Sequence, residues 1–162
     1  MSVEAKYNLL LKVYESISLD YADNPEWRHL ITGLDGTLNA SSTVPATMVW
    51  SDERTLAGAS ETLDFTALAR SPLANVDATG LKLQLMLLKA AEGNNVAGLL
   101  FDVGATNGYN LLGNANGQVL LHPGAAILQF EPDKLPDVSG TEKTIDISGT
   151  AADEYGILLV FG

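Results

Sequence analysis

Five consecutive apolar residues, Ile157 to Phe161, constrain the fold of this chain more than any other stretch. An apolar run of this length without a polar face is typical of a β-strand that is covered on both sides. Gly156, directly before the run, favours a strand over a piece of buried helix. The stretch Lys143 to Gly162 reads as a short strand, a turn region rich in Gly, Ala and Asp, and this final strand, which together predict a β-hairpin that forms one wall of a β core.

Composition indicates a folded protein and limits the classes of partner that it could bind. The chain has 162 residues, of which 46% are hydrophobic, so one domain spanning residues 1–162 has room for a core. The net charge is −11 and no basic patch occurs, which argues against binding to nucleic acid or to an anionic membrane. The lack of cysteine excludes disulfides, thiolate metal sites and a cysteine nucleophile.

The N-terminal residues predict a strand rather than a targeting signal. Tyr7 to Val13 alternates between apolar and polar residues, although a helical reading through Tyr7, Leu10, Leu11 and Tyr14 stays open. The start has no signal-peptide pattern, and the longest apolar runs fall far short of the roughly 20 residues that a membrane span needs. We therefore expect a soluble protein that is synthesised in the cytoplasm.

The next segment predicts a short helix and a loop. The residues from Asp23 to Trp27 resemble a helix N-terminus with a capping box and a proline in the first turn. The helix would place Trp27, Leu30 and Ile31 on one face and end near Gly33. Residues 33–46 are expected to form a loop, and residues 1–36 an arm that is held less tightly than the core at 46–162.

From Ala46 onward the sequence predicts short strands separated by turns. Leu81 to Lys89 alternates best, with Leu81, Leu83, Leu85 and Leu87 on one face, and it is expected to form a hairpin with a strand at Val96 to Val103. Further strands are predicted at Ala46 to Trp50, Arg54 to Ala57, Glu61 to Ala69, Val119 to Leu121 and Ala126 to Phe130. About nine short strands without αβ alternation predict an all-β fold, an antiparallel sandwich of the jelly-roll kind.

The sequence presents no catalytic signature. His29 and His122 are best read as surface or loop residues, and no serine lies in a G-x-S-x-G elbow. The pairs Asp20 with Asp23 and Asp133 with Asp137 could offer oxygen ligands to Ca²⁺, but neither follows a spaced calcium-loop pattern. We therefore assign no catalytic, cofactor-binding or metal-binding residue and expect no cofactor.

Two further features have a functional and a structural interpretation. The glycine- and asparagine-rich segment Gly104 to Gly117 lacks the ending of a phosphate-binding loop and is better explained by turns. Trp27, Trp50, Tyr109 and Tyr155 could line a sugar-binding face, but core or interface positions are favoured.

The segment from Ala46 to Ala69 resembles a recurring segment in small structural proteins of tailed bacteriophages. The pattern is carried by Trp50, Asp52, Arg54, Thr55, Leu56, Glu61, Leu63, Asp64 and Phe65. The segments LKLQLMLLK, GATNGYNLLG, VLLHPGAAILQF and KTIDISGTAADEYGILLVFG then follow in the order typical of that family, so the resemblance covers residues 46–162.

The resemblance implies a virion structural protein. Within that class it favours a head cement or decoration protein on the capsid surface. Its partners would be the major capsid protein and further copies of itself, and a trimer is one candidate oligomer. A tail, neck or fibre component is the nearest alternative, followed by a carbohydrate-binding module. An enzyme such as a glycosidase would need two converging carboxylates, and no pair stands out in the sequence.

Overall fold

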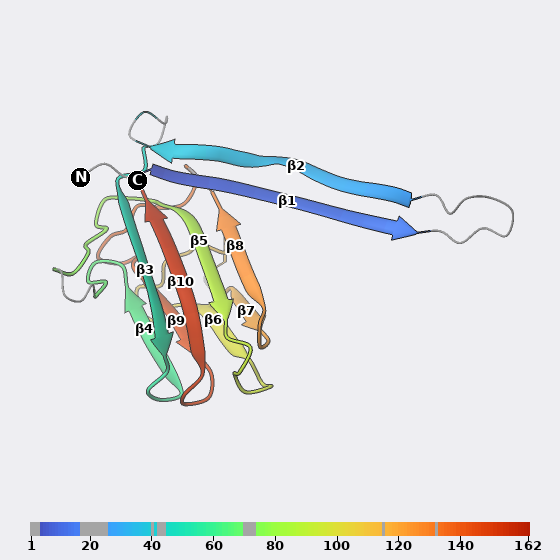
Figure 1. The fold of residues 1–162 in the computed structure, drawn as a ribbon. Coiled ribbons are helices and arrows are strands. Elements are labelled where there is room, and N and C mark those ends of the chain that lie inside the picture. The colour runs from blue at the N-terminus through green and yellow to red at the C-terminus, as the bar shows by residue number, and fades with distance from the viewer. Residues whose placement is uncertain are drawn as a thin grey trace, which may run out of the picture.

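The computed structural model describes residues 4–16, 26–39, 41, 45–69, 74–114, 116–131 and 133–162. Within these ranges the protein is all-β, with ten strands and no helix, as Figure 1 shows. The strands are β1 (Glu4–Ser16), β2 (Glu26–Asn39), β3 (Met48–Thr55), β4 (Ser60–Asp64), β5 (Leu83–Ala90), β6 (Leu99–Val103), β7 (Gln118–Leu121), β8 (Ala126–Phe130), β9 (Thr144–Ser148) and β10 (Glu154–Phe161).

Strands β3 to β10 form two antiparallel sheets of four strands each. Sheet I has the order β3-β10-β5-β8, and sheet II has the order β4-β9-β6-β7. Strands are paired from the outside of the sequence inward: β3 with β10, β4 with β9, β5 with β8 and β6 with β7. Strands that follow one another in the chain therefore lie in different sheets, with β6 and β7 as the exception.

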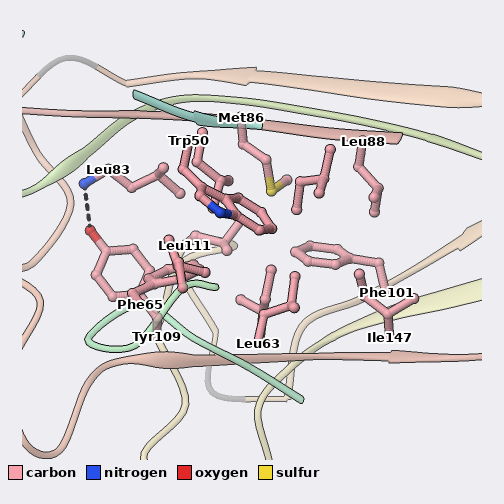
Figure 2. Close-up of a cluster of buried hydrophobic side chains, with 14 of the residues drawn as sticks. Trp50, Leu63, Phe65, Leu83, Met86, Leu88, Phe101, Tyr109, Leu111 and Ile147 are labelled. Carbon is pink, nitrogen blue, oxygen red and sulfur yellow. Dashed lines mark hydrogen bonds between the residues drawn. The ribbon is translucent and has the colours of Figure 1, made fainter. Parts of the chain in front are cut away.

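The inner faces of the two sheets share one hydrophobic core. Met86 and Leu88 from sheet I pack in the same cluster as Phe101 and Ile147 from sheet II, as Figure 2 shows. Phe65 makes edge-on ring contacts to Tyr109 and Phe161, with ring centroids 5.2 and 5.4 Å apart. Each large side chain buried in this way stabilises the fold by roughly 1.5–3 kcal/mol relative to exposure. The expected all-β fold of two antiparallel sheets is thereby confirmed.

The final strand lies at the centre of sheet I, but the predicted C-terminal hairpin is wrong. β10 pairs with β3 on one side and with β5 on the other. β9 belongs to sheet II, where it pairs with β4 and β6. The turn between β9 and β10 therefore connects the two sheets, and a local turn signal does not distinguish this from a hairpin within one sheet.

Strand β5 also departs from its expected faces and partner. Phe161 pairs with Leu83 and Val160 pairs with Leu85, so Gln84 is an extra residue in β5 and forms a bulge. Leu83 lies in the inner core, whereas Leu85 lies in a second cluster on the outer face of sheet I. The predicted hairpin of β5 with the following strand is wrong as well, because β6 lies in sheet II.

The N-terminal strand is confirmed, and the helix predicted after it is wrong. Residues Glu26–Asn39, including Trp27, Leu30 and Ile31, form β2, which pairs with β1 as a separate antiparallel sheet. This pairing overrides the local capping signal, of which Asp23 to Pro25 lies outside the described residues. Half of the expected loop at 33–46 is also strand, since β2 runs to Asn39.

The β1–β2 hairpin extends away from the two sheets. In Figure 1 its base lies beside the end of β10, and its far end lies well beyond the edge of the sheets. Among the described side chains of the hairpin, Leu38 at its base makes hydrophobic contact with the rest of the protein, where it packs with Ala46, Leu85 and Val160. None of the described residues forms a helix that is both long and apolar enough to cross a membrane.

Candidate interaction surface

The outer face of sheet I is apolar over two of its three cross-strand rows. Strand register places one residue of each strand in every row, in the order β3, β10, β5, β8. The first row is Val49, Val160, Leu85 and Phe130, the second is Ser51, Leu158, Leu87 and Leu128, and the third is Glu53, Gly156, Lys89 and Ala126. Apolar residues in the first two rows make this face unlike that of an ordinary solvated sheet.

The hairpin base covers the first row and leaves the second open. Leu38 and Ala46 pack with Leu85 and Val160, all four being buried. In the second row, Leu87 is 37% exposed and Leu128 is 44% exposed. The same apolar surface is therefore covered by the chain itself at one end and exposed along its middle.

A depression lies over Gly156 where the second and third rows meet. Its volume is about 490 Å³, and its lining includes Leu87, Leu158 and Gly156 with Glu53 and Lys89 at its margin. A Cβ atom added to Gly156 would meet no atom within 4 Å. No neighbouring group in the described chain therefore requires glycine at this position of the central strand.

The outer face of sheet II is polar by comparison. Asp146 accepts a hydrogen bond from the Thr62 hydroxyl at 2.5 Å and one from the Ala105 amide at 2.9 Å. Asp102 lies opposite Asp146 in the strand register and accepts a hydrogen bond from the Gln118 amide at 2.7 Å. The same face also carries the apolar pair Leu100–Leu120, with Leu120 49% exposed. The two outer faces therefore differ in that sheet I has two neighbouring apolar rows, whereas sheet II mixes polar and apolar pairs.

The register of the β1–β2 hairpin sorts its residues into two alternating sets. The apolar set contains the pairs Ala5–Leu38, Tyr7–Gly36, Leu9–Leu34, Leu11–Ile31, Val13–His29 and Glu15–Trp27. The polar set contains Glu4–Asn39, Lys6–Thr37, Asn8–Asp35, Lys12–Leu30, Tyr14–Arg28 and Ser16–Glu26. The register thus groups the mostly apolar residue types of the hairpin into alternate pairs. Burial at the base agrees, since Lys6 is exposed and Leu38 is buried.

The polar residues singled out between Trp50 and Phe65 serve the scaffold, and Asp52, Arg54 and Glu61 form a hydrogen-bonded network at one end of the two sheets. Arg54 donates hydrogen bonds to Glu61 at 2.8 Å and to Asp52 at 2.9 Å. The Tyr155 hydroxyl donates to the other oxygen of Glu61 at 2.5 Å. Trp50, Leu56, Leu63 and Phe65 are buried in the core, and Asp64 pairs with Lys143 at 2.6 Å. These contacts explain the residue types of the segment as scaffold rather than as chemistry.

Two tyrosines are buried, Tyr155 in the hydrogen-bonded network and Tyr109 in the core. Burial raises the pKa of Tyr155, and its hydrogen bond to Glu61 raises it further. Burial likewise raises the pKa of Tyr109 to about 12. The hydrogen bond to Glu61 is the main cause that raises the pKa of Arg54 above its ordinary value. All three groups therefore keep their structural protonation state at neutral pH, and none is prepared for proton transfer.

The sugar-binding interpretation of the aromatic residues has no support among the described side chains. Trp50 is 2% exposed, Tyr109 0% and Tyr155 2%, so none of them offers a ring to a ligand. Trp27 lies in β2. The expectation that these aromatic residues fill the core is confirmed for the three buried rings.

The polar candidates from the sequence are not brought together. Asp133 pairs with Lys134 and Asp137 pairs with Lys82, while Asp20 and Asp23 lie outside the described residues. Among the described residues no group of three potential metal ligands occurs. His122 lies exposed after β7, and His29 lies in β2.

The segment Gly104 to Gly117 closes one end of the core with turns. The Asn107 carbonyl accepts hydrogen bonds from the amides of Lys143 and Thr144, and Asn107 itself has a φ of 56°. Tyr109, in the same segment, accepts a hydrogen bond from the Leu83 amide at 3.0 Å and donates one to the Pro136 carbonyl at 2.7 Å. Its glycines and asparagines thus serve turn geometry, as the sequence suggested.

Sequence reasoning missed the apolar outer surface of sheet I. A signal was present, because Leu85 to Leu88 is apolar at four successive positions and so makes both faces of β5 apolar.

Comparison with the models of known protein families, with curated proteins and with solved structures gives no match for this chain.

Proposed function

We propose that this protein is a structural protein of a bacteriophage virion, specifically a cement or decoration protein on the capsid surface. The class rests on the resemblance of residues 46–162 to small structural proteins of tailed phages. The observation that carries an adhesive role is the open apolar row of sheet I next to a hairpin that extends from the body and whose register groups apolar residue types in alternate pairs. A protein that adheres to its neighbours needs such surfaces and needs no catalytic cluster.

The strand order supports a jelly-roll as the finer description of the fold. Pairing from the outside inward, with β6 and β7 at the tip, is what results when a long antiparallel ribbon is rolled into two sheets. A jelly roll has eight strands in two sheets and contains two Greek keys. Such folds serve as building units of capsids, among other functions, so the fold alone does not select a role.

The proposed partners are the major capsid protein and further copies of this chain. The acidic surface, with a net charge of −11, suits a shell surface that carries basic residues. A place in the tail, neck or fibre is the second candidate, because such parts present the same kinds of adhesive surface. A catalytic role is not proposed.

Quantitative mass spectrometry of gradient-purified particles tests the proposal, with heads and tails separated before digestion. We expect peptides of this chain in the head fraction, at a constant ratio to the major capsid protein. Recovery in the tail fraction would instead support the second candidate. Recovery only in the unassembled soluble fraction would contradict a virion role altogether.

A further inference from the structure

We propose that the open part of the sheet I surface is the docking site for the β1–β2 hairpin of a second copy of this chain. The contact would place the apolar set of one hairpin over the second row and the Gly156 depression of the other copy. Association of copies requires no phage shell, so this inference does not depend on the proposed function.

The chain itself shows which kind of surface fits this face. Leu38, a member of the apolar set, already packs on the first row of its own sheet I with Leu85 and Val160. The second row continues that apolar surface, with Leu87 paired to Leu158 and to Leu128. More of the same apolar set is therefore the chemically matched cover for the second row.

The hairpin is too long for all of its apolar set to pack on the sheets of its own chain. At about 3.3 Å per residue, a strand of 13 residues is roughly 43 Å long, whereas the eight residues of β10 span roughly 26 Å. Figure 1 shows the far part of the hairpin pointing away from both sheets. The far part of the hairpin is thus placed to meet another molecule rather than sheet I of the same chain.

Gly156 gives an independent reason to expect a closely approaching partner. Glycine in the interior of a central strand weakens it by roughly 0.5–1 kcal/mol relative to alanine and often marks close approach of another backbone. No atom of the described chain occupies the space above Gly156, and its backbone does not adopt a positive φ. The glycine therefore leaves room for a group from outside the described part of this chain.

The area available approaches that of a specific interface only if the exchange is reciprocal. A two-stranded ribbon about 10 Å wide and about 40 Å long presents a face of roughly 400 Å². Because the base of each hairpin already covers the first row of its own sheet, only part of this face is free. Two such contacts, one in each direction, therefore bury less than roughly 800 Å² on each protomer, toward the lower end of specific interfaces. A one-way contact would be half as large and correspondingly weak.

Point variants of the full chain test the docking site by sedimentation velocity over a concentration series. Gly156→Val fills the depression with a strand-favouring residue, so the fold should persist while self-association weakens at least about tenfold. Gly58→Val is the matched control, because Gly58 also has free space above it but lies in an exposed turn away from the face. It should associate as the wild type does.

Two further pairs of variants, each a test and its control, decide the question if Gly156→Val does not fold. Leu128→Thr alters the second row, and Leu120→Thr alters a similarly exposed leucine, 49% exposed, on sheet II. On the hairpin, Leu9→Thr with Leu11→Thr changes the apolar set, and Lys6→Thr with Asn8→Thr changes the polar set. Leu128→Thr and the double variant Leu9→Thr with Leu11→Thr should weaken association, and their two controls should not.

Cross-linking then identifies the partner surface directly. The chain has no cysteine, so each introduced thiol is unique. Chains carrying Leu11→Cys are mixed with isotopically labelled chains carrying Leu128→Cys or, as the control, Leu120→Cys. We expect mixed disulfides with Leu128→Cys at least about tenfold in excess of the control.

Three outcomes would overturn the inference. The first is a wild-type chain that stays monomeric throughout the concentration series. The second is equal cross-linking of Leu11→Cys to the two sheets. The third is cross-linking of Leu11→Cys chains only to each other, which would mean that hairpins pair with hairpins.

Discussion

The hydroxyl of Tyr155 and the carboxylate of Glu61 meet at 2.5 Å and join β10 of sheet I to β4 of sheet II. Arg54 on β3 donates to the same carboxylate at 2.8 Å, so Glu61 holds two strands of the opposite sheet. Hydrogen bonds to a charged group are stronger than neutral ones. This junction closes the end of the sandwich near the turns that lead into β4 and β10, and it fixes the spacing of the two sheets there.

Replacing Glu61 with alanine should destabilise the protein markedly. The change leaves the Tyr155 hydroxyl without its acceptor and Arg54 without its main partner, at a cost of about 2–3 kcal/mol in the free energy of unfolding. Glu53→Ala on the exposed face of β3 is the control and should change stability by about 0.5 kcal/mol or less. Urea unfolding measures both, and equal stability of the two variants would contradict the role of the junction.

The interior tyrosines should make the fold sensitive to alkali. Burial raises the pKa of Tyr109 to about 12, so the folded state keeps its proton when the unfolded state loses one near pH 10. The stabilisation is fully present below about pH 10 and declines toward pH 12, by up to about 1.4 kcal/mol per pH unit for each such group. Urea midpoints between pH 9 and 12 should fall less steeply for Tyr109→Phe, and identical slopes would contradict this assignment.

Asp64 should contribute stability that is lost in acid. Burial alone would raise the pKa of this carboxyl, but hydrogen bonds from Lys143 and Thr66 outweigh burial and hold the pKa below its ordinary value. The contribution is therefore present above about pH 4 and disappears as the pH falls through the folded-state pKa. Asp64→Asn should cost about 1 kcal/mol at pH 7 and less at pH 3. A cost that is independent of pH would show that the ion pair with Lys143 is unimportant.

Two glycines with the same backbone angle should respond differently to alanine. Gly98 and Gly80 both have a φ of 79°, where a side chain costs roughly 1–2 kcal/mol. A Cβ at Gly98 would lie 2.6 Å from the Leu121 carbonyl oxygen, whereas one at Gly80 would meet nothing within 4 Å. Gly98→Ala should thus lose at least about 2 kcal/mol more than Gly80→Ala in thermal or urea unfolding. Equal losses would mean that the loop at Gly98 relaxes freely.

The sequence allowed most strands to be predicted, but it did not allow their partners to be assigned. The apolar run from Ile157 to Phe161 predicts a strand covered on both faces, and β10 contributes to the core on one face and to the second cluster, through Val160, on the other. The turns after β5 and β9 look like hairpin turns, yet they connect different sheets. Turn chemistry specifies a reversal of the chain and not the sheet to which the next strand returns.

The remaining differences have equally specific causes. The bulge at Gln84 transfers Leu85 and Leu87 to the outer face, which an unbroken alternation cannot indicate. Around Trp27, twelve register pairs with β1 outweigh a short-range helix signal. The apolar surface of sheet I depends on the bulge, which turns Leu85 and Leu87 outward, and on the β1–β2 hairpin, whose base covers part of it. This surface is the part of the candidate site that the sequence alone did not locate.

Cryo-electron microscopy of intact virions tests the central claim most directly. We predict density for this two-sheet fold on the outside of the capsid shell, with a two-stranded hairpin that crosses from one copy to the sheet I face of its neighbour. A shell without such density, or density for the fold confined to the tail, would contradict the account of this chain as a capsid cement protein.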